Sequence, residues 1–267
     1  MSTPPRTPRP HARRPAAAGF SLIELMIALA IALFLIAGMA LIFQNTRSTY
    51  TAEKSLAQLQ DNERLAMTMM ADVIQSAGYF PNPAQNFAQN ALPASPDFPT
   101  AQNSWDTDAN IAANSNAQGE TISVRYAASP TDALMNCMGQ TNTSGGLLSW
   151  DNTLSVDANG FLTCQSWDSA DGKTSTAELV GGFATGNGVQ SMSFMYGVNT
   201  GTASNGSCVD TYMTATQVTA GSYWPAVCSV TVSLVFVNPL PPADGSKPTI
   251  TFTRVIALMN QAGVNNS

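Results

Sequence analysis

An uncharged apolar segment near the N-terminus constrains this chain more than any other feature. From Leu25 to Asn45 the sequence contains no charged residue and no proline. As a helix, residues 21–43 would be about 35 Å long, which is enough to cross the hydrocarbon core of a bilayer. A cleaved secretory signal has a shorter apolar region followed by a small-residue cleavage site, and no such site follows Phe43. The segment is therefore predicted to be a retained, membrane-spanning helix.

The residues on either side of the apolar segment predict its orientation and a special role for one carboxylate. Residues 1–19 contain four arginines and no acidic residue, which keeps that side cytoplasmic and directs the chain after Phe43 outward. Glu24 lies at the start of the apolar segment, where a charged group costs about 2.5–3.5 kcal/mol on insertion scales. A plain signal anchor does not explain this residue, so Glu24 is expected to be functional and to need a partner.

Residues 19–25, Gly-Phe-Ser-Leu-Ile-Glu-Leu, resemble the type III signal of type IV pilins and type II secretion pseudopilins. The resemblance implies that a membrane peptidase cleaves between Gly19 and Phe20 and methylates the new N-terminal Phe20. It also implies that Glu24 meets the N-terminal amine of a neighbouring subunit during assembly. An ammonium and a carboxylate that are each costly in lipid neutralise one another when helices stack, which agrees with that role.

The charge balance and the single histidine exclude several classes of function. Loss of residues 1–19 reduces Lys plus Arg from 11 to 7 against 17 Asp plus Glu, so the mature net charge is −10. Such a charge argues against non-specific nucleic-acid binding. The mature chain would also lack His11, which removes His-based hydrolases and most zinc sites. We therefore expect no enzyme activity, no cofactor and no metal.

The segment 106–117 contains an incomplete calcium-loop pattern. Asp106, Asp108 and Asn110 resemble the opening of an EF-hand loop. However, Ile111 stands where that loop requires glycine, and Ala117 stands where it requires glutamate. The pattern does not indicate a site.

The helix is predicted to continue beyond the membrane to Ala77. Residues 44–77 contain no proline or glycine, and Gly78 with the prolines that follow ends the pattern. The spacing of apolar residues predicts one stripe that packs on a sheet. The stripe consists of Leu56, Leu59, Ala66, Met70, Val73 and Ala77.

The rest of the chain divides into an irregular connection and a β-rich domain. Residues 79–118 are rich in Asn, Gln and Pro without clear periodicity, and residues 119–267 show apolar alternation typical of strands. No helical pattern alternates with these strands, so the sheet should be largely antiparallel and the fold α+β. Arg254 falls on the apolar face of the last strand, so it should lie at an edge or pair with a carboxylate. The expected strands surround Ile122–Tyr126, Leu147–Trp150, Phe161–Cys164, Met192–Val198, Val230–Phe236 and Ile250–Leu258.

All four cysteines fall in the outward part of the chain. Four cysteines in an oxidising compartment imply two disulfides with three possible connectivities. Sequential pairing, Cys137 with Cys164 and Cys208 with Cys228, is expected because each pair brackets a plausible hairpin. Each bond would contribute about 3 kcal/mol by constraining the unfolded chain.

A second, looser resemblance concerns the outer domain. Four parts of this domain are similar to PilW-type minor pilins: residues 179–182, residues 189–197, Trp224 and residues 253–260. Together with the N-terminal motif, the likeness covers most of residues 19–260. Major pilins of the family usually carry a proline in the apolar half of the helix, whereas none occurs here between Phe20 and Phe80. That departure favours a minor subunit.

The resemblance implies five segments, a location and a set of partners. The subunit would sit in the inner membrane with its outer domain in the periplasm, and later in a complex that primes and tips the pilus. Its partners would be other minor pilins, the major pilin, the prepilin peptidase, the assembly platform and membrane lipid, with no nucleic acid. The segments are the leader 1–19, the membrane half-helix 20–43, the outer half-helix 44–78, the connection 79–118 and the β-rich domain 119–267.

Two other functions stay open at this point. A J-type minor pseudopilin of type II secretion shares the helix and the glutamate, and neighbouring genes would distinguish the two. A tip adhesin or a DNA-uptake subunit is the other alternative, although the acidic charge argues against direct DNA contact.

Overall fold

The computed structural model describes residues 19, 21–83, 86–96, 98, 111–116, 119–201, 208–240 and 248–259. Residues 1–18, Phe20 and the Asp106–Asn110 segment considered for calcium lie outside this description. The chain divides into two compact units, Met1–Thr51 and Ala52–Ser267, and each is described by itself.

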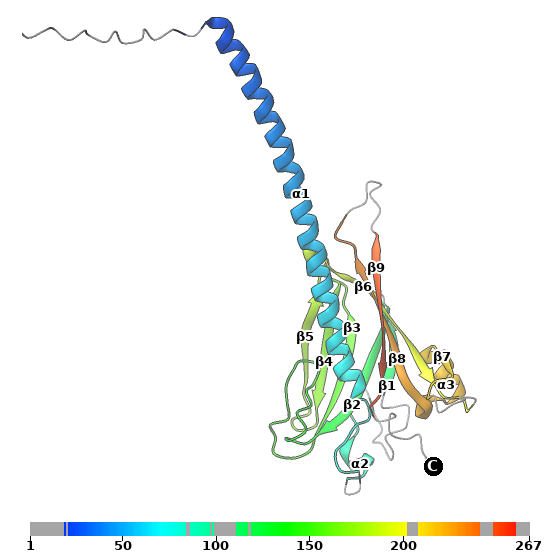
Figure 1. The fold of residues 1–267 in the computed structure, drawn as a ribbon. Coiled ribbons are helices and arrows are strands. Elements are labelled where there is room, and N and C mark those ends of the chain that lie inside the picture. The colour runs from blue at the N-terminus through cyan, green and yellow to red at the C-terminus, as the bar shows by residue number, and fades with distance from the viewer. Residues whose placement is uncertain are drawn as a thin grey trace, which may run out of the picture. The chain divides into compact units, whose positions relative to one another are not determined.

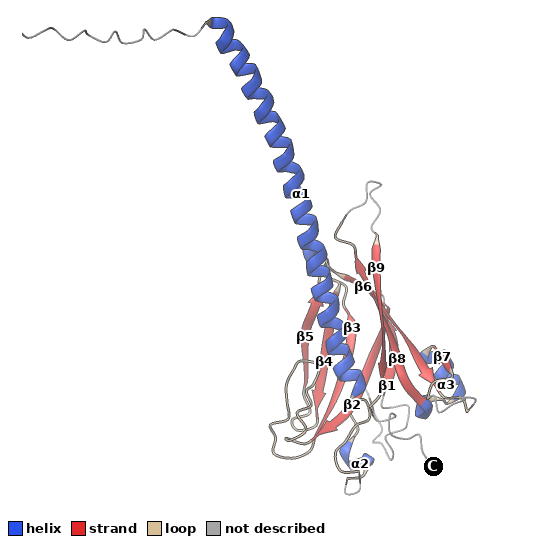
Figure 2. Cartoon of the chain, viewed as in Figure 1, coloured by secondary structure: helices blue, strands red, loops and turns tan. Residues whose placement is uncertain are grey.

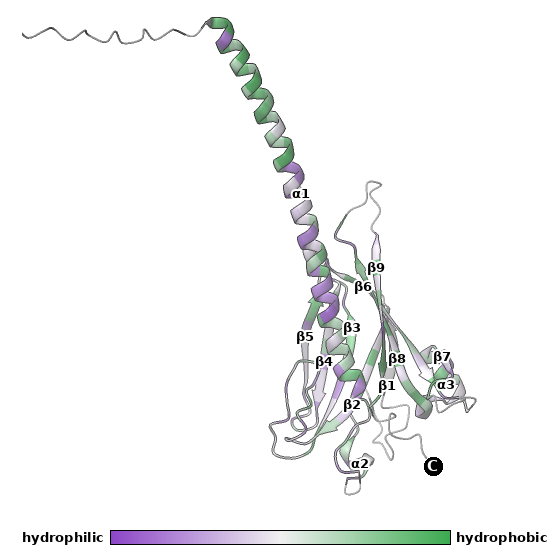
Figure 3. Ribbon diagram, in the orientation of Figure 1, coloured by the Kyte–Doolittle hydropathy of each residue, from purple (hydrophilic) through white to green (hydrophobic). Residues whose placement is uncertain are grey.

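The predicted long helix is present as α1 (Leu22–Gln75), 54 residues long. It ends two residues before the expected Ala77, because the backbone tightens into turns and Gly78 adopts a left-handed φ of 70°. The apolar first part of α1 stands out in Figure 3, and its side chains from Leu22 to Phe43 are exposed within the chain. By length and composition this part can cross a membrane.

The described part of the outer unit contains nine strands in one sheet (Figures 1 and 2). The main path runs β5-β4-β3-β2-β6-β8-β9, while β1 pairs with β2 and β7 pairs with β6. All pairs are antiparallel except β2 with β6, which meet only at Gly119 and Met192. The bounds are β1 Ile111–Asn116, β2 Gly119–Ala128, β3 Leu148–Val156, β4 Phe161–Asp168, β5 Thr174–Gly181, β6 Val189–Val198, β7 Thr211–Met213, β8 Val227–Val237 and β9 Thr249–Ala257.

The α+β, largely antiparallel plan is confirmed, with additions that the sequence did not indicate. Each of the six expected strands is present, extended in β2, β3 and β4. The segment expected to be irregular, with room for a short helix, contains the short helix α2 (Ala88–Ala91) and, unexpectedly, the strand β1. The strands β5 and β7 and the helix α3 (Ala215–Gly221) were also missed. These elements are short or polar, so apolar periodicity does not reveal them.

The outer half of α1 packs on the sheet through the expected stripe. Five of its six members are buried, and Leu56 is half-buried. The buried face is wider than predicted because Met67, Ala71 and Ile74 join it. Fully burying a side chain such as leucine or methionine contributes about 1.5–3 kcal/mol, so this face holds the helix on the sheet.

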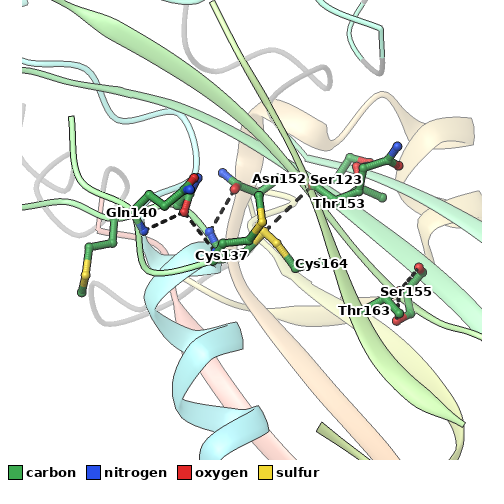
Figure 4. The surroundings of a disulfide bond; sticks show 12 residues. Ser123, Cys137, Gln140, Asn152, Thr153, Ser155, Thr163 and Cys164 are labelled. Carbon is green, nitrogen blue, oxygen red and sulfur yellow. Dashed lines mark hydrogen bonds between the residues drawn. A yellow bond between two sulfur atoms is a disulfide. The ribbon is translucent and has the colours of Figure 1, made fainter. Parts of the chain in front are cut away.

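The structure joins the four cysteines in sequential pairs, Cys137–Cys164 and Cys208–Cys228. The first bond ties the loop before β3 to β4, and the Cys137 N–H donates to Asn152 Oδ1 at 3.0 Å beside it (Figure 4). The second encloses β7 and α3 rather than a simple hairpin. Both bonds therefore fasten excursions of the chain to core strands.

Gly119 lies where β2 meets β6, and it should be the described glycine least able to accept a side chain. Its φ is 117°, and an added Cβ would lie 2.3 Å from the Met192 carbonyl oxygen. We expect Gly119→Ala to lower the free energy of unfolding by more than about 2 kcal/mol, measured by urea denaturation. Gly139→Ala is the matched control, because Gly139 has a φ of 77° but no atom within 4 Å of the added Cβ. Equal losses in both variants would show that backbone strain, and not the close approach of the strands, decides the effect.

Stability should fall above pH 10 because two core tyrosines are buried. Burial raises the pKa of Tyr126 and Tyr196 above the ordinary value of 10.0. The folded protein therefore keeps protons that the unfolded chain loses, and the contribution of these tyrosines to stability is present below pH 10 and lost as the pH rises above it. Burial lowers the pKa of Arg125 from 12.5 to about 10, which acts in the opposite direction but involves only one group. The expected net fall is about 1.4 kcal/mol per pH unit.

Replacing Tyr196 with phenylalanine should flatten this alkaline fall. The Tyr196 hydroxyl is buried without a hydrogen-bond partner among the described residues, so its removal should leave stability at pH 7 unchanged or slightly higher. Urea midpoints from pH 9 to 11 measure the slope. An unchanged slope in Tyr196→Phe would contradict the assignment.

Candidate assembly site

The Glu24 carboxylate lies in the first turn of α1. Its Oε2 accepts a hydrogen bond at 3.1 Å from the backbone N–H of Ser21, three residues earlier. The N-terminal end of a helix carries unsatisfied N–H groups and partial positive charge, so a carboxylate is well placed there. Glu24 therefore caps the helix start within its own chain.

The surroundings of Glu24 on the described part of the first unit are apolar. The large side chains that follow it are exposed, including Leu25 and Met26, and no charged residue occurs until Arg47. Among the described residues no basic side chain forms an ion pair with Glu24. Within the described residues this carboxylate has no counter-charge, which in a bilayer is the condition for recruiting one from another subunit.

The processing residues frame this helix start. Gly19 is exposed, and no atom of the chain approaches within 4 Å of a Cβ added there. Phe20, the other processing residue, lies outside the described residues. Gly19 and Glu24 are brought near one another by sequence alone, and the role of both stays a prediction.

The sequence did not indicate a buried charged cluster on the outer unit. Arg125 on β2 is fully buried, its Nη1 donates to the Pro93 carbonyl oxygen at 2.8 Å, and its guanidinium lies 4.5 Å from the centre of the Phe98 ring. Asp151, its register partner on β3, is the negative charge that acts on it and favours its charged form. Ser95 donates a hydrogen bond to Asp151 Oδ2. The cluster binds Pro93, Ser95 and Phe98 to the sheet.

This cluster is a structural feature and not an accessible site. Arg125 and Asp151 are 0% and 2% exposed, so no substrate could reach them without displacing the segment that holds Pro93, Ser95 and Phe98. The alternation of Ile122, Val124 and Tyr126 places Arg125 on the other face of β2. The covering segment hides it, and no periodicity in that segment signals this. Within the described residues, no three His, Cys, Asp or Glu side chains are placed to hold a metal ion.

Comparison with known families agrees with both parts of the chain. A family model described as type IV pilus-assembly protein W, PilW, matches residues 151–260, which run from β3 to just past β9. A second model, the prokaryotic N-terminal methylation motif, matches residues 14–40, which include Gly19 and Glu24. Neither a curated protein nor a solved structure matches the chain significantly. The chain belongs to the PilW family of type IV pilus assembly proteins and carries the N-terminal methylation motif of that kind of subunit.

Proposed function

We propose that this chain is a minor pilin that takes part in type IV pilus biogenesis, in a complex that primes the fibre and stays at its tip. The observation that carries the proposal is Glu24, a carboxylate without a charged partner among the described residues, at the head of an exposed apolar helix. The match of residues 14–40 to the N-terminal methylation motif supports it. The role is structural, in agreement with a family of assembly proteins.

The proposed sequence of events follows from the chemistry of the helix. The chain inserts into the inner membrane with residues 1–19 in the cytoplasm and the outer domain in the periplasm. Prepilin peptidase cleaves after Gly19 and methylates Phe20. The new amine of a neighbouring subunit then pairs with Glu24, and this neutralises two charges that are both costly in lipid. The apolar helices bundle as the fibre grows from the inner-membrane platform.

The outer domain then presents its surface to other pilins. The PilW match over residues 151–260 favours the pilus over the alternative of a J-type pseudopilin in type II secretion. Two disulfides fasten its excursions, as suits a domain that works outside the cytoplasm.

Deletion of the gene, with complementation from a plasmid, tests the proposed function. The deletion strain should lose most surface pili, counted by electron microscopy and by immunoblot of sheared fibres, while secretion of exoproteins is unchanged. Complementation with the wild-type chain should restore pili. Normal piliation in the deletion strain would contradict the proposal, and a secretion defect with normal piliation would favour the pseudopilin alternative.

A further inference from the structure

The sheet ends in two strands whose outer edges are unpaired among the described residues. β5 and β9 stand at the two ends of the strand order, and Figure 1 shows them to the left and right of α1. β9 pairs with β8 over nine residues without a shift in register, and β5 has one irregularity, at Leu179. Neither strand contains the proline or lysine that often protects an edge. Each edge is a template for one more strand.

The topology gives these two edges opposite directions. Every neighbouring pair on the path is antiparallel except β2 with β6, so β5 and β9 run in opposite senses. If two copies stand side by side with the same orientation, β9 of one copy lies antiparallel to β5 of the other. Antiparallel pairing is the slightly more stable ladder. Copies anchored in one membrane share such an orientation.

A groove beside β5 offers acceptors and negative charge. It has a volume of about 550 Å³ and lies between α1 and β5, where Gln58, Asp61, Glu178 and Asn187 are among its lining residues. None of the described residues that line it is a lysine or an arginine. Asn187 is 4% exposed, and its Oδ1 has no hydrogen-bond partner among the described residues. The groove therefore suits a cationic group that donates several hydrogen bonds.

The opposite edge carries such a group. Arg254 is the one charged residue of β9 and is exposed. Its Nη1 donates to the Met67 carbonyl oxygen on α1 at 3.3 Å, and not to a carboxylate, so it lies at an edge, as one of the two sequence expectations had it. A guanidinium has five N–H donors in a fixed fork that matches carboxylate and amide oxygens. Among the described residues this side chain makes one bond, to a carbonyl, which leaves most of its donor capacity unused there.

We infer that β9 of one copy of this chain adds to β5 of a second copy, with Arg254 entering the acidic groove of that copy. The contact joins different surfaces, so it repeats from copy to copy instead of closing into a symmetric dimer. Arg254 is level with Met67, whereas the groove is level with residues 58–62 of α1. The difference of about seven helical residues predicts a displacement of about 10 Å along the helix between neighbours. The inference rests on the proposed function, because membrane anchoring sets the common orientation.

Thiol cross-linking of the full-length chain in membranes tests the pairing. Thr176 on β5 and Ala257 on β9 are exposed and lie near facing positions in such a ladder. The four native cysteines are all in disulfides, so an introduced cysteine is the free thiol of each variant. Thr176→Cys and Ala257→Cys chains carrying different epitope tags are co-expressed and treated with a short bismaleimide. A mixed-tag dimer is expected, and the variant with both cysteines should give a ladder of higher oligomers.

The single variants expressed alone are the matched controls. Thr176→Cys with itself, or Ala257→Cys with itself, should give little dimer, because like edges do not meet in this arrangement. Absence of the mixed-tag dimer, or equal dimer in the single variants, would overturn the inference.

Charge reversal tests the role of Arg254. Arg254→Glu should reduce the mixed-tag dimer about tenfold, and Glu178→Arg on the other chain should restore part of it. Formation of both native disulfides checks that each variant folds. An unchanged yield with Arg254→Glu would remove Arg254 from the contact. If cross-linking fails while deletion of the gene still abolishes piliation, edge pairing is wrong and the proposed function stands.

Discussion

Replacing Glu24 with alanine is expected to leave leader removal and membrane insertion intact and to exclude the subunit from assembled pili. The apolar run from Leu25 to Asn45 is unchanged in this variant, so insertion does not suffer. What is lost is the counter-charge for the N-terminal amine of a neighbour. Breaking a buried ion pair by removing one partner costs about 3–5 kcal/mol, which corresponds to more than about a hundredfold in binding.

The measurement compares the tagged subunit in sheared fibres and in membranes by quantitative immunoblot. Glu24→Gln is the sharper control, because it keeps the size of the side chain and its capacity to accept the Ser21 N–H, and removes only the charge. Both variants should be missing from fibres. Incorporation of Glu24→Gln at the wild-type level would show that shape and helix capping, and not charge, account for this residue.

Replacing Asp151 with asparagine is expected to give the largest loss of stability among single changes in the outer unit. Arg125 is fully buried, and Asp151 is the negative charge that acts on it. Without that charge the buried guanidinium loses its counter-charge, at a cost of about 3–5 kcal/mol. The loss should be accompanied by early exposure of residues 93–98, because Arg125 and Asp151 hold that segment through Pro93 and Ser95.

Urea denaturation measures the free energy of unfolding, and limited proteolysis reports the release of residues 93–98. Asp171→Asn is the matched control, because Asp171 is exposed and its ion pair with Lys173 lies on the surface. That variant should unfold at the wild-type urea concentration. Similar midpoints for Asp151→Asn and the wild type would mean that the buried charge pair does not hold the segment.

The long helix and the central strands were predictable because each has its own local signal. The stripe from Leu59 to Ala77 repeats at helical spacing, and β8 alternates between buried and half-buried residues. In contrast, β5 reads as Thr-Ser-Thr-Ala-Glu-Leu-Val-Gly, and its exposed first residues carry no alternation. The chain pairs it with β4 only after the turn at Gly172 brings it back. Pairing of this kind depends on tertiary context that periodicity does not contain.

The functional residues also divide into those that the sequence predicts and those that only the fold brings together. The roles expected for Gly19 and Glu24 rest on neighbouring positions in the sequence, so they could be predicted before the fold. The Arg125 cluster and the groove beside β5 assemble residues from segments far apart in the chain, such as Asp61, Glu178 and Asn187. Only the order of the strands and the packing of α1 on the sheet bring these residues together. For Arg254 the sequence left two alternatives, an edge position or pairing with a carboxylate, and gave no direction of the edge.

The mass of the mature protein tests the central claim most directly. The protein is purified from pili or membranes, and its N-terminal peptide is sequenced by tandem mass spectrometry. The account predicts that the chain begins at Phe20, that its amine carries one methyl group, and that Gly19→Ala blocks or greatly slows this processing. A native chain that begins at Met1, or at any residue after Glu24, would contradict it.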